Sequence, residues 1–443
     1  MSHVERAVGI GLLLGCMMYP APAKAQLNTV FSNIFNEILV VRLQQSGSPG
    51  QHGSHFLEAA ARANSELVPA LNSLIAGNVS SFPLSSTSPG ILFDFSTGQP
   101  VRVSESLGPI LAENAKTLGG GKFLVEANYT YLDLVGFRGT SLTSMQFAFT
   151  HKDVTQEGTL GESPNESDVI YVDMDLHVRS GIGVVFATLG ITNSLDVSVA
   201  VPIVSVWLSG TSEATISSYT FPRLGHANHL FGSDTLNPIL TTQVPYNEQA
   251  SGLGDIAVRL KYSIARGGAV DFAALVDARV PTGKEEDFLG SGEAALRIWG
   301  ILSRKFGDVT PHLNLGYVRK WAELQSDALE FRAGFDSKLY SSLTLAADFL
   351  GKIDLNADEA IHLAPGSATI TDIIPPPPGG KSVRRVNLSN VPDRDNDNSF
   401  AMSLGFRFAP SDTWLLFANI MVPLNDGGLR ASVAPTFGVS AIF

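Results

Sequence analysis

Two neighbouring stretches of the chain alternate apolar and polar side chains, and this alternation restricts the folds that the chain can adopt. In the first stretch, which begins at Asp255, the apolar residues are Ile256, Val258, Leu260, Tyr262 and Ile264. The pattern resumes from Val270 to Val280, after the pair Gly267-Gly268. A side-chain period of two indicates extended strands, and the glycine pair predicts the turn of a hairpin.

The polar face of both strands carries charged residues, which is unusual for a soluble sheet. Each strand is about as long as the ~9–11 tilted residues that cross a bilayer. An apolar face against lipid and a charged face toward water inside a closed barrel explains both observations. The pattern therefore predicts an all-β fold, a transmembrane antiparallel β-barrel.

Hydropathy excludes the other class of membrane-spanning protein. The chain has 443 residues, of which 44% are hydrophobic. Beyond the N-terminus, however, it contains no apolar run of about 18 residues or more, which a helical bundle would need several times. Outer-membrane barrels distribute their apolar residues in alternation, so they combine moderate hydropathy with the absence of helical spans.

The N-terminus has the pattern of a secretory signal. An apolar core runs from Ala7 to Met18, and Ala23-Lys-Ala25 is a small-x-small cleavage site. We therefore expect residues 1–25 to be a signal peptide. Lipidation of Cys16 is the alternative that the sequence leaves open. Cys16 is also the single cysteine, so a mature chain that begins at Gln26 excludes disulfides, thiolate metal sites and cysteine nucleophiles.

Residues 26–121 do not alternate and form a separate N-terminal segment. Phe31–Leu43 and His55–Ile75 have the spacing of apolar residues that is typical of helices, and Pro69 is expected to kink or divide the second helix. An irregular stretch follows as far as Gly121. This partly helical segment is expected either to plug the barrel or to lie in the periplasm, and the sequence does not separate the two.

The barrel is expected to cover residues 122–443, with about 14 strands. The predicted strands are 122–131, 143–150, 168–178, 184–191, 195–208, 255–264, 270–280, 292–305, 309–321, 328–336, 343–353, 400–408, 413–423 and 429–443. Short and long connections alternate after residue 192, as expected if short turns face the periplasm and long loops the exterior. The long connection at 151–167 breaks that rule, so 12 strands is the alternative. The polar stretches 209–251 and 354–398 are predicted as loops.

The predicted lumen face carries the candidate site residues. In a water-filled lumen they could pair across strands or define a polar path for a solute; the alternative is a mutually paired interior without specificity. The main candidates are Asp173, Asp175, His177, Arg259, Lys261, Asp271, Asp277, Arg279, Arg297 and Arg332, and Glu330 and Asp348 share the same face.

Motifs for metal binding and catalysis are weak. His226 and His229 have i, i+3 spacing without a nearby carboxylate, which argues against a metal site. Asp393–Asp397 imitates a calcium loop, but the central glycine is missing and Leu404 occupies the twelfth position. No G-x-S-x-G or phosphate-binding loop is present. We therefore predict no metal, no cofactor and no enzyme activity.

Charge and the C-terminus indicate which partners to expect. The net charge of −12 does not indicate nucleic-acid binding. The last residues place Phe437, Val439, Ala441 and Phe443 on one face. This is similar to the closing strand that the barrel-assembly machinery of Gram-negative bacteria reads. We expect this machinery, outer-membrane lipid and lipopolysaccharide as partners.

Several motifs between residues 168 and 443 together resemble one family. They are Gly252–Tyr262, Val280-Pro-Thr-Gly283, Phe288–Gly292, His312–Tyr317 and the turn Gly190–Asp196 followed by Val201-Pro202. The chain resembles the outer-membrane family associated with meta-pathway phenol degradation, related in form to long-chain fatty-acid transporters. The resemblance implies a barrel that admits hydrophobic or aromatic small molecules. We expect an outer-membrane channel for their passive uptake; the alternative is a structural or adhesive barrel without a continuous pore.

Overall fold

The computed structural model describes most of the chain. The described residues are 26–45, 55–81, 83–84, 86, 91–94, 99–102, 106–156, 158–161, 164–321, 324–356, 358, 360–374, 379–411 and 413–441. The predicted signal peptide with Cys16, and the terminal Phe443, lie outside these residues.

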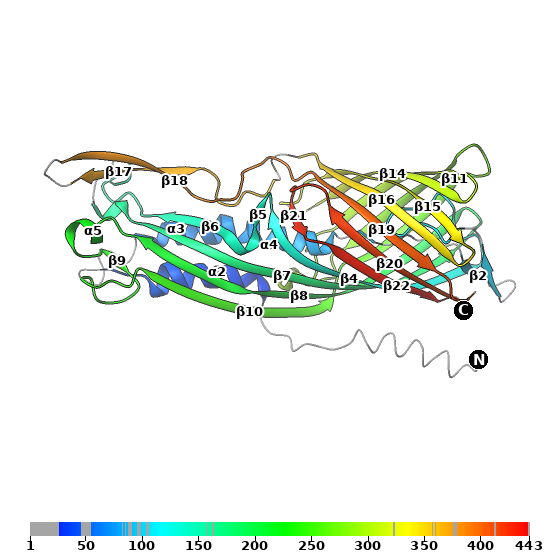
Figure 1. Cartoon of the computed structure of the whole chain (residues 1–443), viewed down its shortest axis with the longest axis horizontal. Coiled ribbons are helices and arrows are strands. Elements are labelled where there is room, and N and C mark those ends of the chain that lie inside the picture. Colours follow the sequence, from blue (N-terminus) through cyan, green and yellow to red (C-terminus); the bar gives the residue numbers. More distant parts are fainter. Residues whose placement is uncertain are drawn as a thin grey trace, which may run out of the picture.

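A closed antiparallel ring of twelve strands forms the barrel in this described part of the chain (Figure 1). In order around the ring they are β4 (Lys122–Phe137), β7 (Val169–Gly190), β8 (Leu195–Ser217), β11 (Ile256–Ala265), β12 (Asp271–Val280), β13 (Ala295–Ser303), β14 (Val309–Lys320), β15 (Ala328–Tyr340), β16 (Leu343–Asp354), β19 (Ser399–Phe408), β20 (Trp414–Pro423) and β22 (Ala434–Ala441). β22 pairs with β4 and closes the ring.

The ring therefore has fewer members than the roughly 14 strands expected from the sequence. The segments predicted at 168–178 and 184–191 are one continuous strand, β7, because Gly181 and Gly183 stay paired with β8 instead of forming a turn. The segment predicted at 143–150 is β6 (Met145–Thr150), which pairs with the far half of β7 and does not enter the ring.

The outer surface of the ring is apolar, and its inner surface carries charges. On β11, Val258, Leu260 and Tyr262 are 38%, 46% and 53% exposed, whereas Arg259 and Lys261 are buried inside. β13 to β16, β19 and β20 continue the exposed apolar belt. The alternation from which the barrel was predicted is thus present, with the apolar face turned outward.

Two strands continue well beyond the ring and build an extension, on the left of Figure 1. β7 and β8 have 22 and 23 residues, and their far halves pair with β6 and with β10 (Thr241–Leu253). Much of the predicted loop 209–251 is therefore strand. Likewise, the predicted loop 354–398 contains the hairpin of β17 (Ser367–Ile374) and β18 (Gly380–Asn387).

Helices from the N-terminal segment pack against the inner face of this extension (Figure 1). They are the 3₁₀ turn η1 (Leu27–Thr29), α2 (Val30–Asn36), the π-turn η2 (Glu37–Arg42), α3 (Leu57–Arg62), the π-turn η3 (Ala63–Leu67) and α4 (Val68–Ser80). Pro69 stands in the first turn of α4, directly after η3, where proline is tolerated. No helix in the described residues is both long and apolar enough to span a bilayer.

Short elements complete the fold. They are β1 (Gln44–Gln45), β2 (Ile91–Asp94), β3 (Gln99–Arg102), β5 (Thr140–Ser141), β9 (His229–Leu230), β21 (Leu429–Ala431), α5 (Phe221–Leu224) and the 3₁₀ turns η4 (Leu142–Ser144), η5 (Pro164–Ser167) and η6 (Glu285–Asp287). β1 pairs with β9 in the extension, and β2 pairs with β3 and with the start of β4.

Candidate functional site

Residues 106–118, here called the inner segment, run through the barrel lumen. They have no regular secondary structure, so their backbone groups need hydrogen-bond partners from elsewhere. Side chains of the lumen wall supply these partners. Thr344 Oγ1 accepts from Leu107 N at 2.8 Å, Ser303 Oγ from Ala115 N at 3.1 Å, and Asp196 Oδ2 from Leu118 N at 2.8 Å. Asn314 binds Glu113 twice, accepting from its N at 2.7 Å and donating to its carbonyl oxygen at 2.9 Å.

Arginines of the wall bind the carbonyl side of the same segment. Arg407 Nε donates to the carbonyl oxygen of Pro109 at 3.0 Å, and Arg332 Nη1 donates to that of Leu111. Contacts on both sides of the backbone therefore fix the inner segment to strands β8, β13, β14, β15, β16 and β19.

A buried charge network joins the inner segment to β11 and β12. Glu113 lies 3.0 Å from Lys261 Nζ and 3.4 Å from Arg259 Nη1. Arg259 Nε also binds Asp277 Oδ2 at 2.9 Å, and Arg279 Nε lies 3.8 Å from Asp277. All five side chains are largely buried, so removing one partner would leave an uncompensated charge, which typically costs about 3–5 kcal/mol.

A second polar cluster holds the beginning of the inner segment. His312 Nε2 lies 2.6 Å from Asp348 Oδ1, and its Nδ1 lies 3.7 Å from Asp336 Oδ1. Ser106 donates to Asp336, and Ala112 N donates to Asp348 at 3.4 Å. His312 is the first residue of the motif His312–Tyr317, so part of the family resemblance lies in the wall that binds the inner segment.

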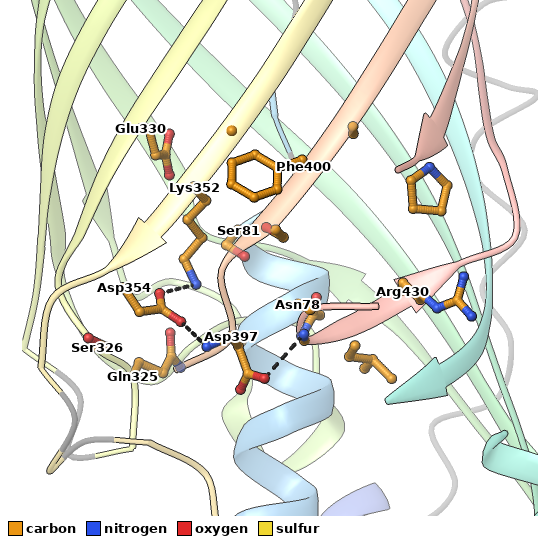
Figure 2. A pocket seen from close by; sticks show the side chains of 18 of the residues that line it. Asn78, Ser81, Gln325, Ser326, Glu330, Lys352, Asp354, Asp397, Phe400 and Arg430 are labelled. Carbon is orange, nitrogen blue, oxygen red and sulfur yellow. Dashed lines mark hydrogen bonds and ion pairs between the residues drawn. The ribbon is translucent and has the colours of Figure 1, made fainter. Parts of the chain in front are cut away.

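A cavity of about 280 Å³ lies in the lumen between the end of α4 and strands of the ring (Figure 2). Asn78 on α4 and Ser81 directly after this helix line it, while Glu330, Lys352 and Phe400 come from β15, β16 and β19. Its wall is partly apolar, through Leu132, Leu134, Phe331, Leu350, Phe400 and Met421. Arg332 lines the cavity and also binds the inner segment, so the two are adjacent.

Positive charge predominates in this cavity. The lining cations are Arg279, Arg297, Lys320, Arg332, Lys352 and Arg430, and the lining carboxylates are Glu330, Asp354, Asp395 and Asp397. Counted by their formal charges, the six basic and four acidic side chains leave an excess of two positive charges. Two pairs lie within the lining: Lys352 with Asp354 at 2.6 Å and Arg297 with Glu330 at 3.9 Å. The cavity thus combines an apolar wall with a positive field.

Most of the candidate residues from the sequence lie in the lumen. Arg259, Lys261 and Asp277 belong to the charge network, while Arg279, Arg297 and Arg332 line the cavity. Glu330 and Asp348 also face inward. Asp271 instead lies at the hairpin turn, where its Oδ1 accepts from Gly267 N at 2.8 Å.

Asp173, Asp175 and His177 do not line the lumen, in contrast to the expectation. They lie on the outer face of β7, where His177 Nε2 is 3.2 Å from Asp175 and Gln146 donates to Asp173 at 2.8 Å. The cause is the extension. There the helices lie inside the sheet, so the apolar side chains of β7 turn inward to pack on them and the polar ones turn outward to water.

Several site residues were missed from the sequence. Lys320 lies on the same face of its strand as His312, and Lys352 on the same face as Asp348. The alternation of side chains along a strand could therefore have identified both lysines as inward-facing. Glu113 stands in an irregular stretch that has no period. Its lone carboxylate among apolar residues was the available signal, but the partners on β11 become adjacent only when the barrel closes.

Comparisons with known proteins agree with the resemblance. Residues 163–346 match the family model described as "Putative MetA-pathway of phenol degradation". The family resemblance is thereby confirmed. The matched part of the chain runs from η5 into β16, so it includes β11, β12 and His312. No curated protein matches the chain.

Two solved structures illustrate the distant similarity of this chain to known proteins. The COG4313 outer membrane channel from Pseudomonas putida F1 is 10% identical, with 74% of this chain and 98% of that chain covered and a TM-score of 0.39. The P. putida toluene transporter TodX is 9% identical, with 74% and 91% covered and a TM-score of 0.32. Because these similarities are low, the barrel fold is inferred from the strand pairing of this chain alone.

Proposed function

We propose that the protein is an outer-membrane channel through which small solutes with an apolar or aromatic body diffuse passively. The observation that carries this proposal is the cavity inside the lumen, where an apolar wall meets an excess of cations. A solute site of this kind needs an apolar surface to bury the body and a few polar groups to orient it. No cofactor and no catalytic residue enter the mechanism.

The belt around the ring supports a membrane location. Exposed apolar residues from β11 to β20 match a lipid-facing surface, and the charged lumen is shielded from it. The short turns at one end of the ring suit the periplasm, which would put the extension and its helices outside the cell. The family match, whose description concerns phenol degradation, supports aromatic solutes.

Charge in the cavity refines the class of solute. Six guanidinium and ammonium groups favour a molecule that carries a carboxylate or phenolate beside its apolar body. A cavity of about 280 Å³ is close to the lower end of the ~300–1,000 Å³ range of small-molecule sites. We therefore infer that single-ring aromatic acids suit the cavity better than long-chain lipids.

The inner segment would act as the barrier in the resting channel. It crosses the lumen beside the cavity, so passage requires this segment to move or to leave a gap. This same feature favours the second candidate, a structural barrel without a continuous path. The two candidates differ in whether any solute crosses a membrane that contains the purified protein.

Uptake into proteoliposomes tests the proposal. We expect benzoate to enter vesicles that contain the protein faster than protein-free vesicles, and Gly77→Phe to slow this entry. Gly77 lines the cavity, and the nearest atoms that a Cβ would meet belong to the flexible side chain of Gln325, so a larger residue can fill the space. Gly77→Ala is the matched control. Equal entry with and without the protein would favour the structural barrel.

A further inference from the structure

Three histidines from distant parts of the chain meet inside the extension, and none of them lines the cavity. His55 lies two residues before α3, His151 directly follows β6, and His229 begins β9. They are 5%, 2% and 1% exposed. One ring nitrogen from each lies within 4.8 Å of the other two. Convergence of three buried imidazoles in one place is the arrangement of a metal site.

Hydrogen bonds fix the tautomers of two of these rings. His229 Nδ1 lies 2.6 Å from Asp168 Oδ2, and His151 Nδ1 lies 2.7 Å from the carbonyl oxygen of Lys152. A carbonyl oxygen and a carboxylate are acceptors, so both Nδ1 atoms carry the proton and the lone pair of each ring is at Nε2. Metal-bound histidines in proteins have this same second contact, to a carboxylate or a backbone carbonyl.

The surroundings of the three rings are themselves held in place. Asp168 is fully buried, and its other oxygen accepts from Tyr219 N at 2.6 Å. Lys152 N donates to the carbonyl oxygen of His55 at 3.0 Å. Phe56 packs edge-on against both His151 and His229. The supporting contacts therefore orient the imidazoles and separate the site from bulk solvent.

We propose that His55, His151 and His229 together bind one divalent transition-metal ion such as Zn²⁺. Imidazole ligands suit zinc, copper, nickel and cobalt, whereas Ca²⁺ and Mg²⁺ prefer oxygen ligands. Two nitrogens on a tetrahedral zinc stand about 3.4 Å apart, given Zn–N bonds of about 2.05 Å. The ligand atoms, now within 4.8 Å, would close up by about 1.4 Å at most. A water molecule would fill the fourth position.

The proposed ion would join three separate elements of the extension. His55 belongs to the helical segment, His151 to the end of β6 and His229 to the β1–β9 pair. Binding would thus fix the N-terminal helices to the strands that enclose them. The i, i+3 pair of His226 and His229, considered in the sequence, does not form the site: His226 is not in the cluster, and its Nδ1 lies near the carbonyl oxygen of Leu224.

Metal binding by the unaltered, full-length barrel in detergent is the first test. We expect one Zn²⁺ per chain by calorimetric titration after treatment with a chelator. Co²⁺ at the same site should give the visible absorption of a tetrahedral nitrogen-ligated ion. Absence of stoichiometric binding by the wild type would overturn the proposal and leave the three rings as an aromatic cluster with Phe56.

Variants test which residues bind the ion. Asp168→Asn keeps all three ligands and is expected to weaken affinity for Zn²⁺ by about 10–100-fold. His151→Gln should abolish the Co²⁺ spectrum. His226→Ala is the matched control, since His226 lies in the same loop region outside the cluster, and it should bind as the wild type does. Each variant is compared by circular dichroism to confirm the fold. Unchanged binding in folded His151→Gln, or loss of binding in His226→Ala, would contradict the assignment.

Discussion

Lys261 Nζ on β11 lies 3.0 Å from Glu113 Oε2 in the inner segment, although 148 residues separate them in the chain. This ion pair connects the wall of the lumen to the segment that crosses it. It also explains why β11 carries adjacent inward cations at Arg259 and Lys261, since Glu113 contacts both. The charged face of the hairpin is therefore a binding surface for the chain's own inner segment.

Glu113→Gln is expected to destabilise the barrel and to loosen the inner segment. The substitution leaves buried Arg259 and Lys261 without their shared carboxylate, which should cost about 3–5 kcal/mol. We expect a lower thermal unfolding temperature together with faster benzoate entry into proteoliposomes. Glu37→Gln serves as the control, because Glu37 pairs with Arg42 at the surface and such pairs contribute about 0–1 kcal/mol. Similar effects of both substitutions would contradict the role of Glu113 in holding the inner segment to β11.

Removal of a cavity cation is expected to alter selectivity more than stability. Lys352→Gln removes one of the six positive charges that line the cavity, and its side chain is about one-third exposed. The ratio of benzoate entry to benzyl alcohol entry should fall, because the anion loses more attraction than the neutral molecule of similar shape. Lys338→Gln, on β15 outside the cavity lining, should leave this ratio unchanged. A constant ratio in Lys352→Gln would show that the cavity does not select by charge.

Truncation of the inward face of β7 is expected to weaken the extension. Met174 is fully buried against the helices, so Met174→Ala should cost about 2–5 kcal/mol in denaturant unfolding. Asp175, its neighbour, is exposed on the outer face, and Asp175→Ala should change stability by about 0.5 kcal/mol or less. A larger loss of stability in Asp175→Ala than in Met174→Ala would instead indicate that the aspartates of β7 face inward.

The alternation predicted the direction of side chains correctly where each face of a strand has one environment along its whole length, as it does in the ring. On β11 and β12 both environments are uniform along the strand, so the period of two reports them directly. On β7 the environment changes along the strand, from helices inside the extension to the lumen inside the ring. The alternation remains visible there, but which face is inside depends on the packed helices.

Other features depend on closure of the fold and have no local signal. Residues 241–253 are strand β10, but the outer face of this strand is polar, so it lacks the apolar residues that marked the strands of the ring. The same applies to the hairpin β17–β18 in the predicted loop. The partners of Glu113 and the meeting of His55 with His151 and His229 involve long separations in sequence, which no spacing rule detects.

The central claim, that solutes pass through the lumen once the inner segment yields, can be tested with a reversible lock. A mature chain from Gln26 has no cysteine, so Ala115→Cys with Ser303→Cys introduces a single pair where Ala115 N contacts Ser303 Oγ at 3.1 Å. Benzoate uptake into proteoliposomes is measured before and after reduction. We predict that oxidation of the pair blocks uptake and that reduction restores uptake to the wild-type rate. Equal uptake in the oxidised and reduced protein, with the disulfide verified, would contradict it.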